Sequence, residues 1–177
     1  MEGSAPVMPR LLHLADVHLG ARHRDLGDAA HQQRGRQLAA FRRAIDVGIE
    51  RRVDVALICG DLFDSNSQPR RTVEGAAAEL RRLADAGIRT VLIPGTHDVY
   101  DRASIYRAYD LATMAGSTAD DDFVTVLRPD MPYVHLPACD VVVHGRVFAT
   151  KRAPTSPLAD FSPDVPGVTA TWRVGMV

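Results

Sequence analysis

The sequence predicts an α/β fold built on a parallel β-sheet, and three observations lead to this prediction. Apolar runs suited to strands occur at residues 10–15, 53–59 and 90–93, and segments with the three- and four-residue apolar spacing of helices separate them. The run at 53–59 is apolar almost throughout, as expected of a strand buried on both faces. The order strand, helix, strand, helix, strand then implies parallel neighbours joined by right-handed crossovers.

The composition is that of an ordinary globular protein. Of the 177 residues, 46% are hydrophobic and 24% are charged, so residues 1–177 are expected to form one domain with a sizeable core. The formal net charge of -1 excludes an overall basic field, and nucleic-acid binding would need a local patch. Four pairs of adjacent arginines are interpreted as solvated helix faces.

The cysteines and the amino terminus indicate a cellular location. Two cysteines are too few for a disulfide framework, and Cys59 lies inside an apolar strand, which indicates a reducing compartment. Residues 1–9 lack the apolar core of a secretory signal, and no stretch is as long as a membrane span. We therefore expect a cytoplasmic protein without membrane contact.

Three helices are expected between and after the first strands. The first covers about 31–52 and the second about 72–86, where Gly87 is a suitable helix stop. The third covers about 104–115 and ends at Gly116.

The second half of the chain has a different character, with short strands and a long loop. The strands are predicted at 124–127, 133–136, 141–143, 146–148 and 171–177. Residues 150–168 contain four prolines and are predicted to be loop.

Acidic residues and histidines stand where three predicted strands end. The three strand ends read Asp16-Val17-His18, Gly60-Asp61 and Gly95-Thr96-His97-Asp98. The carboxyl edge of an open α/β sheet is where ligands bind, and carboxylates mixed with imidazoles suit divalent Mn, Fe or Zn. A single Asp after a strand is explained by turn chemistry, but turn chemistry does not call for histidine. Asp64 is interpreted as a turn residue of this kind.

These motifs resemble the first three motifs of the calcineurin-like metallophosphoesterases. The longer strings at 13–20 and 60–64 are most similar to the SbcD-type DNA-repair exonuclease branch. The resemblance covers residues 10–110 well and the later strands weakly. It implies a metallophosphoesterase-like α/β sandwich and two divalent metal ions, with manganese expected and iron or zinc as alternatives.

The resemblance also implies which residues bind the metals. Asp16 and His18 would bind one ion, and Asp61 would bridge both. Thr96 stands where the family has an asparagine that serves the second ion, and its hydroxyl is a shorter and poorer neutral donor than an amide oxygen.

The remaining motif residues would act in catalysis. His97 matches the histidine that stabilises charge on the phosphoryl group or protonates the leaving oxygen, and Asp98 would orient it. The reaction implied is hydrolysis of phosphodiester bonds by hydroxide that the two metal ions activate.

Two later features of the family are not recognised in this sequence: a further histidine after a later strand and a Gly-His-x-His turn. His144 is a weak candidate for the former and His135 a weaker one. We therefore expect the domain over 1–177 to be incomplete at its carboxyl end, before the last ligand motifs, and to bind fewer than two metals on its own.

The leading hypothesis is a DNA exonuclease or phosphodiesterase subunit acting in DNA repair with an SbcC-like ATPase, and the resemblance is compatible with a homodimer. One alternative keeps the chemistry but takes a small phosphodiester or a phosphoprotein as substrate. Another is a degenerate, non-catalytic binding module, which Thr96 and the missing histidines favour and the intact Asp16, His18, Asp61 and His97 oppose.

Overall fold

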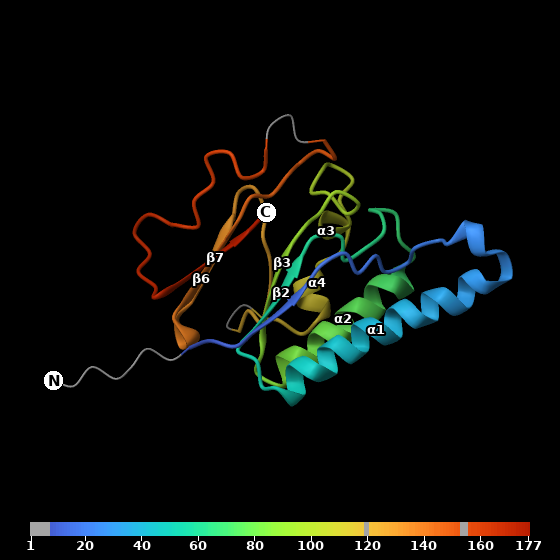
Figure 1. Cartoon of the computed structure of the whole chain (residues 1–177), viewed down its shortest axis with the longest axis horizontal. Helices are drawn as coiled ribbons and strands as arrows, with labels where there is room; N and C mark the ends of the chain where they lie inside the picture. Colours follow the sequence, from blue (N-terminus) through green and yellow to red (C-terminus); the bar gives the residue numbers. More distant parts are fainter. Residues whose placement is uncertain (1–7, 119–120, 153–155) are drawn as a thin grey trace.

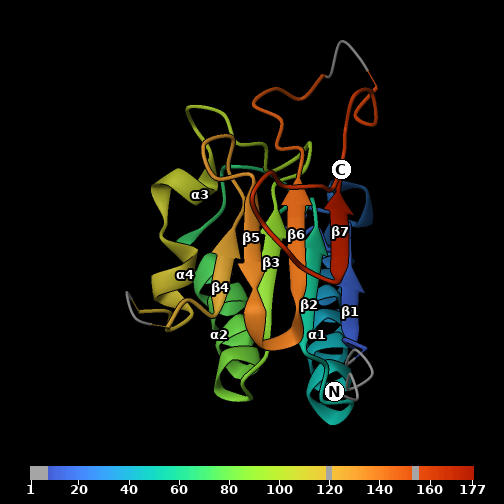
Figure 2. The same ribbon diagram turned by 90° about the vertical axis from the view of Figure 1, so that its left-hand side faces the viewer.

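Two β-sheets face each other, and the two long helices cover the outer side of the larger sheet (Figure 1). This computed structural model describes residues 8–118, 121–152 and 156–177. Seen from the side of the smaller sheet, the three layers lie one behind the other (Figure 2). The predicted α/β sandwich is therefore confirmed.

The larger sheet has four strands, and each is parallel to its neighbours. In spatial order they are β1 (Leu11–Leu14), β2 (Val55–Cys59), β3 (Arg89–Ile93) and β4 (Val124–Val126). The first three strands lie where the apolar runs predicted them, adjacent and parallel. Their carboxyl ends consequently meet at one edge.

The two long helices pack on this sheet through the apolar faces that the sequence predicted. They are α1 (Ala30–Glu50) and α2 (Arg70–Asp85). Phe41 and Ile45 of α1, and Leu80 and Leu83 of α2, are buried in one core with the helix-facing side of the sheet. None of the described helices is long and apolar enough to cross a membrane.

The prediction of one continuous third helix over 104–115 is wrong. The structure has two short helices, α3 (Ile105–Ala108) and α4 (Leu111–Met114), because Tyr109 between them is extended. Asp110 then begins α4 as its N-cap, with Oδ1 accepting a hydrogen bond of 3.0 Å from the backbone N–H of Thr113. A short 3-10 helix, η1 (Arg24–Ala29), also precedes α1.

The smaller sheet contains the last strands of the chain. Its order is β5 (Tyr133–Leu136), β6 (Val141–Gly145) and β7 (Trp172–Met176), and a 3-10 turn, η2 (Pro137–Cys139), links the first two. β5 runs antiparallel to β6, whereas β7 runs parallel to it. The predicted strand at 146–148 does not form, because β6 ends at Gly145 and only Arg146 N–H still reaches the end of β7, at Met176 O (2.9 Å).

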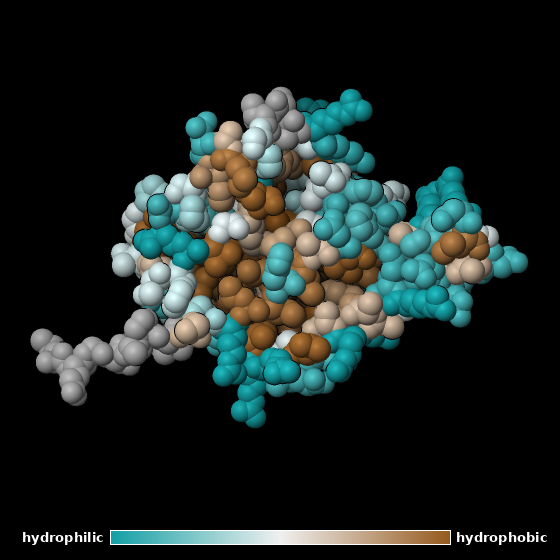
Figure 3. Space-filling model, viewed as in Figure 1, coloured by the Kyte–Doolittle hydropathy of each residue, from teal (hydrophilic) through white to brown (hydrophobic). Residues whose placement is uncertain are grey.

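A second core fills the space between the sheets, with Val55, Leu57 and Val91 facing Val141 and Val143. Beyond β2, strand β1 is an edge strand whose Leu11 is 41% exposed. Apolar surface is accordingly visible across the middle of the face shown in Figure 3.

The loop predicted over 150–168 contains no helix or strand in its described part, and residues 153–155 lie outside the described residues.

Candidate metal centre

Backbone hydrogen bonds tie the loops after β1, β2 and β3 together. Asp16 N–H donates to Gly60 O (3.3 Å), and His18 N–H donates to Asp61 O (2.9 Å). Gly60 N–H in turn donates to Ile93 O at the end of β3 (3.0 Å). The three sequence motifs therefore form one polar edge.

The backbone of this edge is strained at the predicted metal-binding residues. Asp16, His18 and Asp61 have φ of 53°, 52° and 51°, in the left-handed region that costs a non-glycine residue roughly 1–2 kcal/mol. Such conformations persist where the surrounding structure enforces them, and they cluster at functional sites.

Glycine is required at position 95 for a different reason. A Cβ there would lie 2.3 Å from Asp61 Oδ1 and 2.5 Å from Asp61 N. The turn after β3 can approach Asp61 this closely only because Gly95 has no side chain.

His18, Asp61 and His97 form the one group among the described residues that could hold a metal ion. One ligand atom from each lies within 4.8 Å of the others, and His18 Nε2 is 3.9 Å from Asp61 Oδ2. Asp61 is buried (8% exposed), whereas His97 is exposed at the rim. A carboxylate with two imidazoles is a donor set suited to Mn, Fe or Zn, so these residues fit the group that the motifs imply.

Asp16 and Thr96 lie at the border of this group. Asp16 Oδ1 is 3.8 Å from His18 Nε2, and the Asp16 side chain is 76% exposed. Thr96 Oγ1 donates a long hydrogen bond of 3.4 Å to Asp61 Oδ2. Thr96 therefore contacts the carboxylate expected to bridge two metals.

Asp98 is placed differently from the prediction. It is completely buried, and it accepts hydrogen bonds from Gly95 N–H (2.7 Å), Phe63 N–H (3.1 Å) and the Tyr106 hydroxyl. Burial raises the pKa of Asp98, and these three hydrogen bonds oppose the rise. In the described structure Asp98 thus holds the backbone of two site loops and makes no hydrogen bond to the His97 ring.

The residue beside both histidines is Asp64, which sequence reasoning interpreted as a turn residue. Its Oδ1 lies 3.4 Å from His18 Nδ1 and 4.0 Å from His97 Nδ1. Its backbone oxygen is 2.9 Å from His97 Nδ1, so this nitrogen must donate. No spacing in the sequence distinguishes Asp64 from an ordinary turn residue. The parallel bridge between Leu19 and Phe63 pairs the loops after β1 and β2, and this pairing places Asp64 beside His18.

The two weaker histidine candidates do not join the group. His135 and His144 lie on the smaller sheet, in β5 and β6. His144 Nδ1 donates to Ser162 O (2.7 Å). In the described part of the chain, neither histidine belongs to a cluster of metal-binding side chains.

The fold and this site define an α/β domain of the kind that supports metal-assisted chemistry at the edge of a parallel sheet. The chain belongs to the calcineurin-like phosphoesterase family, whose sequence profile matches residues 9–159. The resemblance found in the sequence motifs is therefore confirmed.

Among curated proteins, the chain is similar to the DNA double-strand break repair protein Mre11 of Aeropyrum pernix, with 41% identity over 91 residues, 51% of this chain and 21% of that protein. It is 30% identical over 128 residues to the protein of the same name from Saccharolobus solfataricus, covering 72% of this chain and 31% of that protein. The matches thus span between a fifth and a third of these relatives. The solved structure of Pseudomonas putida nuclease MPE matches 78% of this chain and 55% of that chain at 19% identity, with a TM-score of 0.44, too low to add to the family assignment.

Proposed function

We propose that the chain is the metal-dependent phosphodiesterase domain of a DNA nuclease, acting as an exonuclease subunit with an SbcC-like ATPase. The observation that carries the proposal is the grouping of His18, Asp61 and His97 at the carboxyl edge of the sheet. Family membership supports the ester-hydrolysing chemistry. The similarity to proteins named for DNA double-strand break repair supports DNA as the substrate. The ATPase partner is proposed on the resemblance of the strand-end motifs at 13–20 and 60–64 to the SbcD-type branch.

In this proposal, His18 and Asp61 bind a divalent cation, with Asp16 beside them and Thr96 toward a second ion. Manganese is the cation we expect. A divalent cation supplies charge neutralisation at the phosphoryl group and lowers the pKa of a bound water. Asp61 is already held for this role, because His97 N–H donates to its Oδ1 (2.7 Å) and fixes the carboxylate.

His97 acts at the leaving oxygen. Its Nδ1 proton is committed to the backbone oxygen of Asp64, so the tautomer is set and Nε2 is the nitrogen left for the substrate. The His97 side chain is 50% exposed, which leaves it accessible to a phosphodiester at the rim. Protonated at Nε2, it can pass that proton to the departing alkoxide.

The test measures metal binding and hydrolysis together, on a protein that carries this domain within a chain of its relatives' length, because residues 1–177 alone are expected to bind fewer than two metals. Wild-type protein should bind Mn²⁺ in a calorimetric titration and cleave a DNA oligonucleotide, whereas Asp61→Asn should retain the acceptor oxygen for His97 N–H yet lose the metal. His135→Ala, a histidine outside the group, is the matched control and should bind metal like wild type. If Asp61→Asn binds Mn²⁺ as tightly as wild type, the proposed metal site is wrong.

The same assays separate the alternatives. Metal binding with turnover of a small aryl phosphodiester but not of DNA would assign the chain to small substrates. A protein that binds no Mn²⁺ and hydrolyses neither substrate would be a non-catalytic module.

A further inference from the structure

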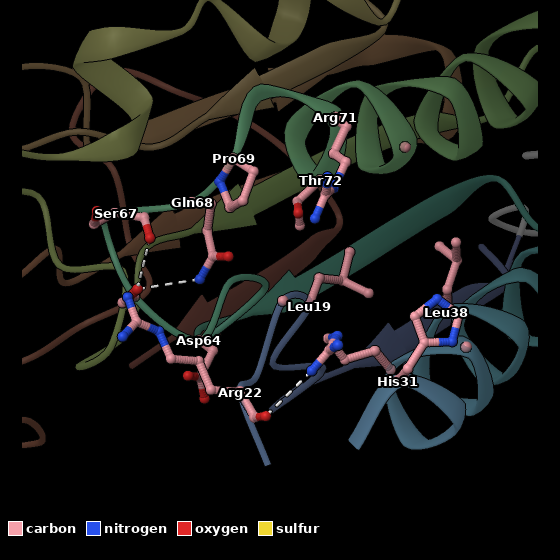
Figure 4. Close-up of a pocket in the computed structure, with 15 residues that line it drawn as sticks. Leu19, Arg22, His31, Leu38, Asp64, Ser67, Gln68, Pro69, Arg71 and Thr72 are labelled. Atoms are coloured by element: carbon pink, nitrogen blue, oxygen red, sulfur yellow. Dashed lines mark hydrogen bonds between the residues drawn. The ribbon is translucent and has the colours of Figure 1, made fainter. Parts of the chain in front are cut away.

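A cleft opens beside the candidate metal centre and shares one residue with it. The cleft has a volume of about 740 Å³ and lies between the amino-terminal parts of α1 and α2 and the loops that follow β1 and β2. In Figure 4, Arg71 and Thr72 of α2 lie on one side of it and Arg22 and His31 on the other. Asp64, which lies beside His18 and His97, also lines the cleft.

The lining of the cleft is strongly basic. Three arginines line it, namely Arg22, Arg34 and Arg71. Among the described residues that line it, Asp64 is the only acidic one. The chain as a whole has a net charge of -1, so this concentration of positive charge is local.

These arginines are also free of carboxylate partners, unlike other arginines on the same helices. Arg70 is held by Glu74 (2.8 Å), and Arg42 is held by Glu79 (2.7 Å). Within the described residues, none of the three cleft arginines forms an ion pair; Arg34 Nη1 donates only to the backbone oxygen of Arg22 (3.2 Å). Their guanidinium groups therefore remain available to an anion.

The chemistry of the lining favours phosphate over bases. A guanidinium group matches phosphate oxygens with paired N–H donors, and the hydroxyls of Ser67 and Thr72 add further donors. The described residues of the lining include no Phe, Tyr or Trp on which a base could stack. A ligand held here would be recognised by its charged backbone.

We infer that this cleft binds the sugar–phosphate backbone of the DNA strand adjacent to the phosphodiester at the metal centre. The inference rests on the proposed function. Asp64 both lines the cleft and lies beside His18 and His97, so a strand bound in the cleft would lead directly to the phosphodiester at the metal centre. Arg34 and Arg71 hold successive phosphates without reading the sequence, and their contacts release counterions from the strand.

The experiment measures binding of a fluorescein-labelled single-stranded oligonucleotide by anisotropy, in EDTA, so that no strand is cut. Arg34→Ala and Arg71→Ala should each weaken binding about tenfold. Each should also make the dependence of log affinity on log salt shallower by about 0.7. Arg36→Ala and Arg70→Ala are matched controls on the same helices, outside the cleft, and should stay within about twofold of wild type. Arg71→Lys keeps the charge and should keep the salt slope.

Two outcomes overturn the inference: cleft variants that bind like their controls, or wild-type protein that does not bind the oligonucleotide in EDTA. The proposed function is judged separately, by hydrolysis with Mn²⁺. Wild-type protein that binds through Arg34 and Arg71 but cuts no DNA would refute the function and leave the cleft assignment standing. Protein that cuts DNA while the variants bind normally would refute the cleft assignment alone.

Discussion

The imidazole rings of His18 and His97 lie edge to face, with centroids 4.6 Å apart and planes at 87°. One comes from the loop after β1 and the other from the loop after β3, and Asp64, from the loop after β2, lies beside both. His18 Nδ1 is buried and has no hydrogen-bond partner among the described residues. A small movement of Asp64 Oδ1 from its present 3.4 Å would satisfy it and leave Nε2 to face a metal.

The first prediction concerns this contact. Asp64→Asn removes the charge that stabilises a donating His18 Nδ1, so we expect Mn²⁺ affinity to fall about 10–100-fold, the usual cost of losing a partner behind a metal-binding histidine. Calorimetric titration measures the change. Asp28→Asn, an exposed carboxylate in η1, is the control. Equal affinities in Asp64→Asn and wild type would mean that Asp64 does not support His18.

The second prediction separates metal binding from catalysis at His97. If His97 acts on the leaving oxygen, His97→Asn should retain Mn²⁺ and lower turnover of an oligonucleotide by roughly 10²–10⁴-fold. Titration and turnover are measured on the same preparation. A parallel loss of metal affinity would instead identify His97 as a ligand, a role that its position within 4.8 Å of the other donor atoms also permits.

The third prediction concerns Thr96→Asn, which restores the residue that the family has at position 96. Thr96 is exposed, and its hydroxyl donates to Asp61 Oδ2 (3.4 Å), so its oxygen is not poised as a strong ligand. Thr96→Asn would place an amide oxygen there, and in a protein of the relatives' length we expect a higher affinity for a second Mn²⁺. Metal titration checks this. Unchanged stoichiometry and affinity would show that Thr96 already fills the role of asparagine at the second metal ion.

The fold could be predicted from local patterns because the sequence carries the apolar periodicity of α1, α2 and the first three strands directly. The failures occur where local pattern is not enough. Residues 104–115 are predicted as one helix that ends at Gly116, yet Tyr109 is extended and Asp110 begins a second helix as its N-cap. Residues 146–148 are apolar enough for a strand, but they lie past the end of β7, a partner more than twenty residues away in sequence.

The site was predictable to the level of motifs but not of side-chain direction. Strand-end motifs placed His18, Asp61 and His97 at one edge because parallel strands end together. Asp98 is the last residue of one motif and Asp64 follows another, and only the folded loops show that Asp98 points into the interior while Asp64 lies beside the histidines. The basic cleft was also missed, since Arg34 and Arg71 are far apart in sequence and resemble ordinary solvated arginines.

The fourth prediction follows from the raised pKa of Asp98. Tyr106 donates from its hydroxyl to Asp98 Oδ2, and this bond lowers the pKa that burial raises. Tyr106→Phe should therefore destabilise the protein at pH 7 by about 1.5–3 kcal/mol, the worth of a hydrogen bond to a charged group. It should also raise the pKa of Asp98 further. The folded variant then takes up its proton at a higher pH than wild type.

The sign of the pH dependence follows from that proton uptake. The stability difference between Tyr106→Phe and wild type should shrink as the pH falls through the pKa of Asp98, because a protonated carboxyl needs the hydroxyl less. Urea unfolding at several pH values measures it. Tyr133→Phe removes an exposed hydroxyl and serves as control. A difference that stays constant with pH would show that Asp98 is not the group affected.

The last prediction tests how closely β3 must approach Asp61. The backbone of Gly95 lies outside the left-handed region, so alanine brings no conformational strain, but its Cβ would lie 2.3 Å from Asp61 Oδ1. The carboxylate must move, which also disturbs its hydrogen bond from His97 N–H. We expect Gly95→Ala to lower stability by about 1–3 kcal/mol and to weaken Mn²⁺ binding. Gly75→Ala, in α2 with nothing near its Cβ, should instead stabilise by roughly 0.5–1 kcal/mol. Gly95→Ala protein with wild-type metal affinity would mean that Asp61 need not stay where the turn after β3 now holds it.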